Sequence, residues 1–131
     1  MKDHAIEVFS TCPVPGGVDR RVFLQNVTDV ARWSEEAGCK GILVYADNSL
    51  PDPWMICQII LENTDRLCPL PAVQPVYAHP YAIAKSVTTL AYLYGRRICL
   101  NMIAGGFTND LIALNEDIRD RKSRYPRGSI N

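Results

Sequence analysis

The sequence has 131 residues, of which 47% are apolar and 21% charged, a composition typical of one soluble globular domain. Fourteen Lys and Arg residues balance fourteen Asp and Glu residues, so no net charge points to nucleic acid or to an anionic membrane. No apolar run reaches the roughly 18 residues of a membrane span, and the first residues lack the apolar stretch of a signal peptide, so we expect a cytoplasmic protein.

Strand and helix patterns alternate along the first half of the chain. Residues 5–10 predict a short strand, which a loop with two prolines and a Gly-Gly pair follows. Asp19 is a plausible N-cap for a helix that continues to Glu36, and Gly38 is placed to end it. Residues 41–46 are a continuous apolar run, typical of a strand buried on both faces.

The second half repeats this alternation. Asp52 and Pro53 predict a helix start, because proline at the first helical position loses no hydrogen bond, and the helix is expected to reach Asn63. A third strand is predicted over residues 70–76, where Pro71 and Pro75 indicate interrupted pairing. The elements expected after it are a helix from His79-Pro80 to Tyr94, a strand over residues 98–103, a short helical piece after Asn109 and a charged, solvated tail over residues 115–131.

These elements give the order βαβαβαβ in a single domain over residues 1–131. The crossovers are long enough for parallel strands, so the fold class is α/β. Right-handed crossovers lead either to an open doubly wound sheet or to an arc of a barrel. No G-x-G-x-x-G motif follows the first strand, which disfavours a dinucleotide-binding domain.

In both parallel architectures, ligands bind at the loops after the carboxyl ends of the strands. Here these are residues 11–17, 47–51, 77–79 and 104–108. Gln74 and Asn101 are polar residues within the apolar third and fourth strands. A buried amide needs hydrogen-bond partners, so each side chain either bonds a neighbouring backbone group or contacts a bound heterocycle.

Other candidates lie in the same loops. Two glycines follow Ala104, at Gly105 and Gly106, and would let a flat ligand approach the backbone, although an ordinary turn explains them equally. Cys12 and Ser49 are placed to face a ligand, and His79 is either a helix cap or a general acid–base group.

The five cysteines show no C-x-x-C spacing, so neither a disulfide framework nor a zinc site is expected, and Cys57 and Cys99 are expected in the core. The chain also has no Ser-His-Asp order, no P-loop and no metal-ligand spacing.

Two stretches together resemble the luciferase-like monooxygenases, especially the alkanesulfonate and long-chain alkane branch. Residues 29–55, DVARWSEEAGCKGILVYADNSLPDPWM, resemble the family's first helix, second strand and D-P-W helix start. Residues 73–106, VQPVYAHPYAIAKSVTTLAYLYGRRICLNMIAGG, resemble the block with H-P before a helix, then L-x-G-R, then L-N-x-x-x-G-G. The two stretches cover about half of the chain in the family's order.

The resemblance implies a (β/α)₈ barrel of which this chain supplies the first four strands. It implies an enzyme that binds reduced FMN (FMNH₂) and uses O₂ to form a flavin peroxide, which oxidises a small organic substrate. A separate NAD(P)H-dependent flavin reductase would supply the FMNH₂, and a homo-oligomer is expected. Carried over by position, Gln74 and Asn101 would contact the flavin ring, and the backbone at Ala104 and Gly105 would lie under it. In this family the third strand often contains a non-proline cis peptide, which would fall between Pro71 and Ala72.

Three departures from the family pattern limit what the resemblance implies. Leu50 stands where the alkanesulfonate branch has a cysteine, and Thr11–Pro13 replace a loop that often carries a histidine, so Cys12 is either a substitute or a filler. Family members are more than twice this length, so we expect a fragment truncated after the fourth strand, without the catalytic residues and the flavin phosphate site of strands five to eight. Two alternatives stay open: a non-catalytic partner or scaffold half-barrel, and a deazaflavin-dependent oxidoreductase of the same fold.

Overall fold

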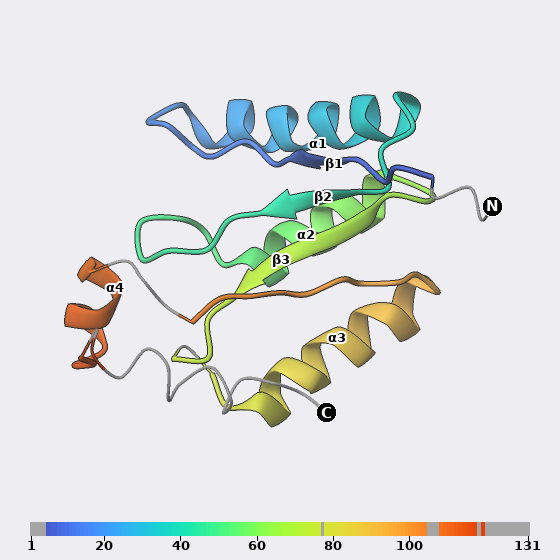
Figure 1. Ribbon diagram of the computed structural model, residues 1–131. Coiled ribbons are helices and arrows are strands. Elements are labelled where there is room, and N and C mark those ends of the chain that lie inside the picture. Colours follow the sequence, from blue (N-terminus) through green and yellow to red (C-terminus); the bar gives the residue numbers. More distant parts are fainter. Residues whose placement is uncertain (1–4, 77, 105–107, 118, 120–131) are drawn as a thin grey trace.

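The computed structural model describes residues 5–76, 78–104, 108–117 and 119, and these residues form one parallel sheet with helices (Figure 1). The sheet order is β1-β2-β3-β4, and each pair of neighbours is parallel, which confirms the predicted α/β arrangement. The elements in chain order are β1 Phe9–Thr11, α1 Arg20–Glu36, β2 Gly41–Val44, α2 Pro53–Asn63, β3 Cys68–Val73, α3 Pro80–Tyr94, β4 Asn101–Met102 and α4 Thr108–Ala113. Most of the predicted charged tail lies outside the described residues.

The three long helices begin where the sequence predicts, and each start has a side-chain cap. The carboxylate of Asp19 accepts the N–H of Arg21 at 2.8 Å at the start of α1. Asp52 caps α2 and His79 caps α3 in the same way, each followed by proline at the first position. Such caps satisfy backbone N–H groups that have no partner within the helix.

The strands differ from the prediction mainly in β4, which has two residues instead of six. Cys99 donates its N–H to the carbonyl of Pro69, and Ile103 donates its N–H to the carbonyl of Val73. The backbone N–H and C=O positions of the odd-numbered residues of β3 therefore point toward β4. Pro69 and Pro71 therefore remove the N–H groups that would bond β4, which confirms interrupted pairing at Pro71.

Smaller differences concern the other strands and one peptide bond. β3 begins at Cys68, earlier than predicted, and β1 starts only at Phe9. The described residues contain no cis peptide bond, so the expectation of one between Pro71 and Ala72 was wrong.

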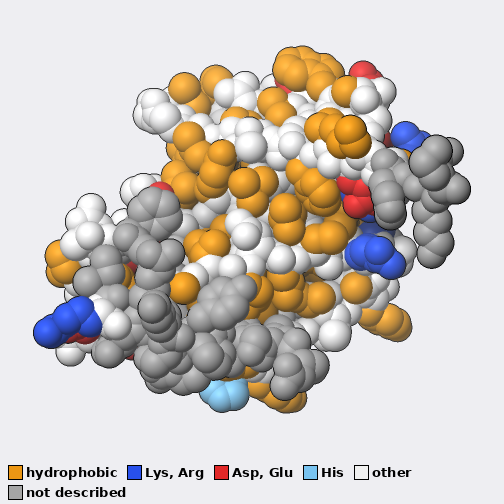
Figure 2. Space-filling view, viewed as in Figure 1, with side chains coloured by type: hydrophobic (Ala, Val, Ile, Leu, Met, Phe, Trp, Pro, Cys, Tyr) orange, Lys and Arg blue, Asp and Glu red, His pale blue; other side chains and the backbone are white. Residues whose placement is uncertain are grey.

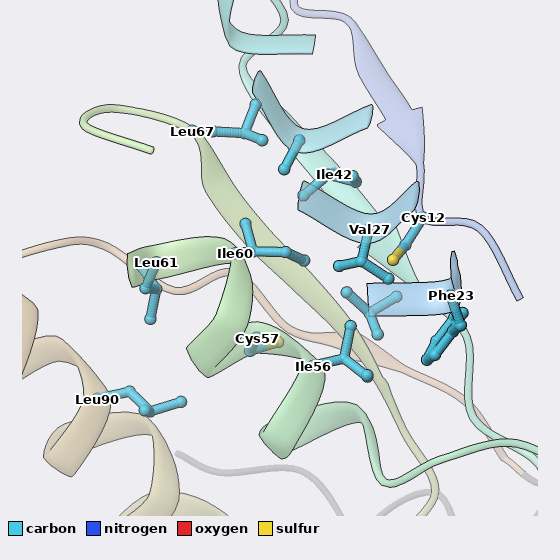
Figure 3. Close-up of a cluster of buried hydrophobic side chains, with 12 residues drawn as sticks. Cys12, Phe23, Val27, Ile42, Ile56, Cys57, Ile60, Leu61, Leu67 and Leu90 are labelled. Carbon is cyan, nitrogen blue, oxygen red and sulfur yellow. The ribbon is translucent and has the colours of Figure 1, made fainter. Parts of the chain in front are cut away.

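The core lies between one face of the sheet and helices α1 and α2, with α3 at its edge (Figure 3). Ile42 and Val44 of β2 point into it and meet Val27 of α1 and Ile60 of α2. Cys57 is fully buried here, as expected, whereas Cys99 is only half-buried. Within the described ranges, no helix combines the length and the apolar composition that crossing a bilayer requires.

Two charged side chains fasten the turn between α2 and β3. The carboxylate of Glu35, at the end of α1, accepts backbone N–H groups from Asp65, Arg66 and Leu67. Arg96, just after α3, donates to the carbonyl oxygens of Thr64 and Leu67 and to the hydroxyl of Thr64. Arg96 thus satisfies carbonyl groups at and just beyond the end of α2, where a helix leaves carbonyls without partners, and Glu35 satisfies N–H groups of the turn that follows.

Candidate functional site

The face of the sheet that points away from α2 would line the interior of the barrel that the resemblance implies, with ligands at the carboxyl ends of its strands. Side chains alternate between the two faces of a strand, so Leu43 points away from the core that Ile42 and Val44 enter. The strand register places on the same face Phe9, Thr11, Gly41, Leu70, Ala72 and Asn101. This face is largely apolar, and Figure 2 shows hydrophobic side chains gathered over it.

A buried polar network lies at the carboxyl ends of β2 and β3. Gln74 and Asp110 are each only 1% exposed. The amide nitrogen Nε2 of Gln74 donates to the carbonyl of Ala46 at 2.9 Å and to Oδ2 of Asp110 at 3.0 Å. Oδ1 of Asp110 accepts the backbone N–H of Asn48 at 2.7 Å. The network therefore holds α4 against the loop after β2 and the end of β3 (Figure 1).

This network answers part of the question that the sequence left open about Gln74. An amide nitrogen carries two hydrogens, and here the two are directed to Ala46 and Asp110. The backbone and side-chain partners expected of a structural amide are thus present.

Asn101 lies on β4, the strand next to β3. It is half-buried on β4, in register with Ala72, two residues before Gln74 in the chain. Ala104 is half-buried just after β4, while Gly105 lies outside the described residues. Gln74 and Asn101 thus lie near the carboxyl ends of adjacent strands, and their contact with one ligand stays a prediction.

A cavity of about 180 Å³ opens beside Gln74, between the first turns of α2 and α3. It is lined by Asp52, Trp54, Ala72, Gln74, Ile83 and Ser86, among others. Pockets for cofactors are typically about 300–1,000 Å³, so this cavity is too small for a flavin ring. This cavity by itself is therefore not a complete cofactor pocket.

The three other candidates have structural roles in three separate loops. Cys12 is 4% exposed and points into the core near Val27 (Figure 3), where burial raises the pKa of its thiol to about 12. This placement favours packing over contact with a ligand. Ser49 is exposed and bonds Asp47 through both its N–H and its hydroxyl. His79 is exposed, and its Nδ1 accepts the N–H of Tyr81, as expected of a helix cap.

Asp110 is the site residue that the sequence analysis missed. It stands in the first turn of the six-residue helix α4, where an acidic residue is ordinary. Its partner Asn48 is 62 positions away, so no local pattern reveals the contact. Among the described side chains, no three His, Cys, Asp or Glu residues gather as a metal site would require.

Comparison with known proteins identifies the family. The sequence profile described as luciferase-like monooxygenase matches residues 6–127. The chain therefore belongs to the luciferase-like monooxygenase family. It is similar to the 4-(gamma-L-glutamylamino)butanoyl-(BtrI acyl-carrier protein) monooxygenase BtrO of Niallia circulans, with 38% identity over 108 residues. That match covers 82% of this chain and 31% of the relative, so the chain spans about a third of the length of this relative.

Solved structures show the same fold. Monooxygenase RslO1 from Streptomyces bottropensis superimposes with a TM-score of 0.81 at 16% identity, over 94% of this chain and 40% of that protein. The oxygenating constituent of 3,6-diketocamphane monooxygenase from Pseudomonas putida, solved with FMN, gives a TM-score of 0.76 at 16% identity, over 92% of this chain and 37% of that protein. The four parallel strands thus correspond to part of the fold of these larger monooxygenases.

Proposed function

We propose that this chain supplies part of the flavin site of an FMN-dependent monooxygenase, which uses O₂ to oxidise a small organic substrate. The observation that carries the proposal is the placement of Gln74 and Asn101 at the carboxyl ends of neighbouring strands, in a chain of the luciferase-like monooxygenase family. One structural relative in this fold contains FMN. Reduced FMN, when bound, supplies the two electrons that activate O₂.

The residues of this chain would bind and orient the flavin ring. Amide side chains suit the edge of a flavin, which presents both donors and acceptors. Gln74, held in place by its hydrogen bonds to Ala46 and Asp110, would make one polar contact with the ring. Asn101 would make the second polar contact, and the backbone at Ala104 and Gly105 would lie against the ring. The apolar face that includes Leu43 and Leu70 would exclude water from the ring.

The partners follow from the same proposal. An NAD(P)H-dependent reductase would supply FMNH₂ to a cytoplasmic enzyme, which we expect to be a homo-oligomer. By its name, the relative from Niallia circulans acts on an acyl group attached to an acyl-carrier protein. A carrier-bound acyl group is therefore one substrate to test here, beside free small molecules.

Flavin binding by the full-length protein tests the proposal directly. FMN, FMNH₂ under anaerobic conditions and a reduced deazaflavin are titrated separately, and affinity is measured by fluorescence or calorimetry. We expect FMNH₂ to bind most tightly, and Asn101→Ala to weaken it up to about tenfold, the value of one hydrogen bond. Asn26→Ala, an exposed amide on α1, is the matched control and should bind like the wild type.

Other results of these titrations would indicate a different cofactor, a different function or a different site residue. Preference for the deazaflavin would replace FMN by that cofactor and a hydride-transfer reaction. No affinity for any flavin, together with a stable complex with another protein, would instead indicate a scaffold half-barrel. Equal FMNH₂ affinity of the wild type and Asn101→Ala would remove Asn101 from the site.

A further inference from the structure

A pair of thiols lies at the opposite end of β3 from Gln74. Cys68 begins β3, and Cys99 lies just before β4. Their sulfur atoms are 3.3 Å apart, although the two residues are 31 positions apart in the chain. Both thiols are free. A disulfide has a bond of about 2.05 Å, so the sulfurs need to approach by only about 1.3 Å to form one.

Backbone contacts hold the two cysteines at this distance. Cys99 donates its N–H to the carbonyl of Pro69 at 3.0 Å, directly beside Cys68. The sulfur of Cys68 lies 3.2 Å from the carbonyl of Arg97, two residues before Cys99. Strand pairing thus holds the backbones of the two cysteines side by side, and their side-chain conformations bring the sulfur atoms to 3.3 Å.

Cys68 lies at a wide hollow on the amino-terminal side of the sheet. The hollow has a volume of about 610 Å³ and is lined by Cys39, Lys40, Arg66, Cys68 and Arg97, among others. Cys99 is half-buried, more accessible than Cys68, which is 4% exposed. A small oxidant therefore has access to the pair through Cys99, the more exposed of the two thiols.

We propose that Cys68 and Cys99 form a redox-active dithiol, which a peroxide oxidises to an intrachain disulfide between β3 and the segment before β4. The thiol of Cys99 loses its proton, and the thiolate attacks H₂O₂ and breaks the O–O bond, which gives a sulfenic acid and hydroxide. The hydroxide takes up the released proton and leaves as the first water. The thiol of Cys68 then attacks that sulfur and forms the S–S bond, and the second water leaves. The two cysteines lose two electrons in total, and the peroxide gains them.

Burial determines the order of these steps. It raises the pKa of Cys68 to about 11, and the hydrogen bond with Cys99 contributes in the same direction. Little Cys68 thiolate exists at neutral pH, so the more accessible Cys99 reacts with the oxidant first. The disulfide would link the two ends of the segment that contains α3. It would thereby join β3, which leads to Gln74, covalently to the segment that leads to Asn101. The proposal does not depend on flavin binding.

The sequence allows this pair to be mapped cleanly, because trypsin places each cysteine on its own peptide. Cys68 falls in residues 67–85 and Cys99 in residues 98–119, while Cys12, Cys39 and Cys57 fall in three others. The full-length protein is treated with H₂O₂, its remaining thiols are alkylated, and the unreduced digest is analysed by mass spectrometry. We expect a cross-linked peptide made of residues 67–85 and 98–119, which separates on reduction.

Matched variants separate this pair from its neighbours. Cys39→Ser, which removes the other thiol that lines the hollow beside Cys68, should give the cross-link to the same extent as the wild type. Cys99→Ser should abolish it and leave Cys68 alkylated. A wild-type protein in which Cys99 is oxidised to sulfinic acid while Cys68 stays reduced would overturn the proposal. A cross-link through Cys39, or no oxidation of either cysteine, would overturn it equally.

Discussion

The amide nitrogen of Gln74 lies 3.0 Å from Oδ2 of Asp110, and both side chains are almost completely buried. This contact joins the end of β3 to α4, and it gives the amide one fixed orientation. A buried carboxylate with hydrogen-bond partners is costly to remove, because the partners then lose their acceptor in a site with little water. Asp110 therefore acts as a positioning residue for the proposed flavin contact of Gln74.

Asp110→Ala should lower the free energy of unfolding by about 2–3 kcal/mol, because Gln74 and the N–H of Asn48 lose a buried acceptor. Urea denaturation measures this loss. Asp110→Asn keeps the shape but offers only one acceptor oxygen, so its loss should be smaller. Asn109→Ala, an exposed neighbour on α4, is the control and should change stability little. If Asp110→Ala unfolds at the same urea concentration as the wild type, the contact contributes nothing to stability.

The same variants test the positioning of the amide. If Asp110 orients Gln74, then Asp110→Asn should weaken FMNH₂ binding at a temperature where the protein is still fully folded. The affinity should fall by no more than it does in Gln74→Ala, and the double variant should resemble Gln74→Ala alone. Additive losses in the double variant would mean that Asp110 affects the flavin by a different route.

Arg96 should contribute strongly to stability, because its guanidinium binds carbonyl groups at the end of α2 and before β3. We expect Arg96→Ala to lower the free energy of unfolding by about 2–3 kcal/mol. Arg96→Lys should recover only part of this, because an ammonium group lacks the planar set of donors that reaches several acceptors. Thermal unfolding measures these losses. Arg97→Ala, which changes the exposed neighbouring residue, is the control. Equal stability of Arg96→Lys and the wild type would show that charge alone suffices.

The sequence predicted those features that depend on neighbouring residues. Asp52 with Pro53 and His79 with Pro80 marked two helix starts, because a cap and its helix are adjacent in the chain. The length of β4 was overestimated, since the prolines that shorten it lie on a different strand. Asp110 was missed for the same reason, because its partners are brought to it only by the folded sheet.

Cys12 shows how a shift in strand position changes an interpretation. From the sequence, Cys12 was expected in a loop after the first strand, with its side chain placed to face a ligand. In the structure its N–H continues the pairing with β2 through the carbonyl of Leu43. The alternation of β1 then turns its side chain into the core, opposite to Thr11. Strand ends predicted from sequence are thus too imprecise to assign a face to a terminal residue.

Gly41→Ala should be strongly destabilising, although alanine is the smallest possible addition. A Cβ atom at this position would lie 2.2 Å from the carbonyl oxygen of Cys68 and 2.6 Å from the ring of Phe9. Since the oxygen belongs to the paired strand β3, the sheet itself would have to move. We expect a loss of about 3 kcal/mol in the free energy of unfolding, as for severe overpacking.

A matched glycine serves as the control for this prediction. A Cβ at Gly17 would meet no atom within 4 Å, so Gly17→Ala should cost only the strain of its positive φ of 79°. The two variants are compared by urea denaturation at the same protein concentration. A larger loss for Gly17→Ala than for Gly41→Ala would contradict the packing argument.

Glu35 should make the stability of the fold depend on pH. Partial burial alone would raise the pKa of Glu35, but hydrogen bonds from the backbone of Asp65, Arg66 and Leu67 and the charge of Arg66 hold it below its ordinary value of 4.5. The folded state therefore favours the charged carboxylate. Its stabilising effect is complete above pH 4.5 and is lost as the pH falls through the lower folded value.

Glu35→Gln tests this dependence, because it keeps one acceptor oxygen but removes the charge. At pH 7 the variant should be less stable than the wild type by about 1–2 kcal/mol, the difference between charged and neutral hydrogen bonds. The two unfolding curves should converge as the pH is lowered below 4.5, where the wild-type carboxylate takes up its proton. Glu36→Gln changes the exposed neighbouring residue and should track the wild type at every pH. A difference between Glu35→Gln and the wild type that stays constant down to pH 3 would mean that the charge is not what stabilises this turn.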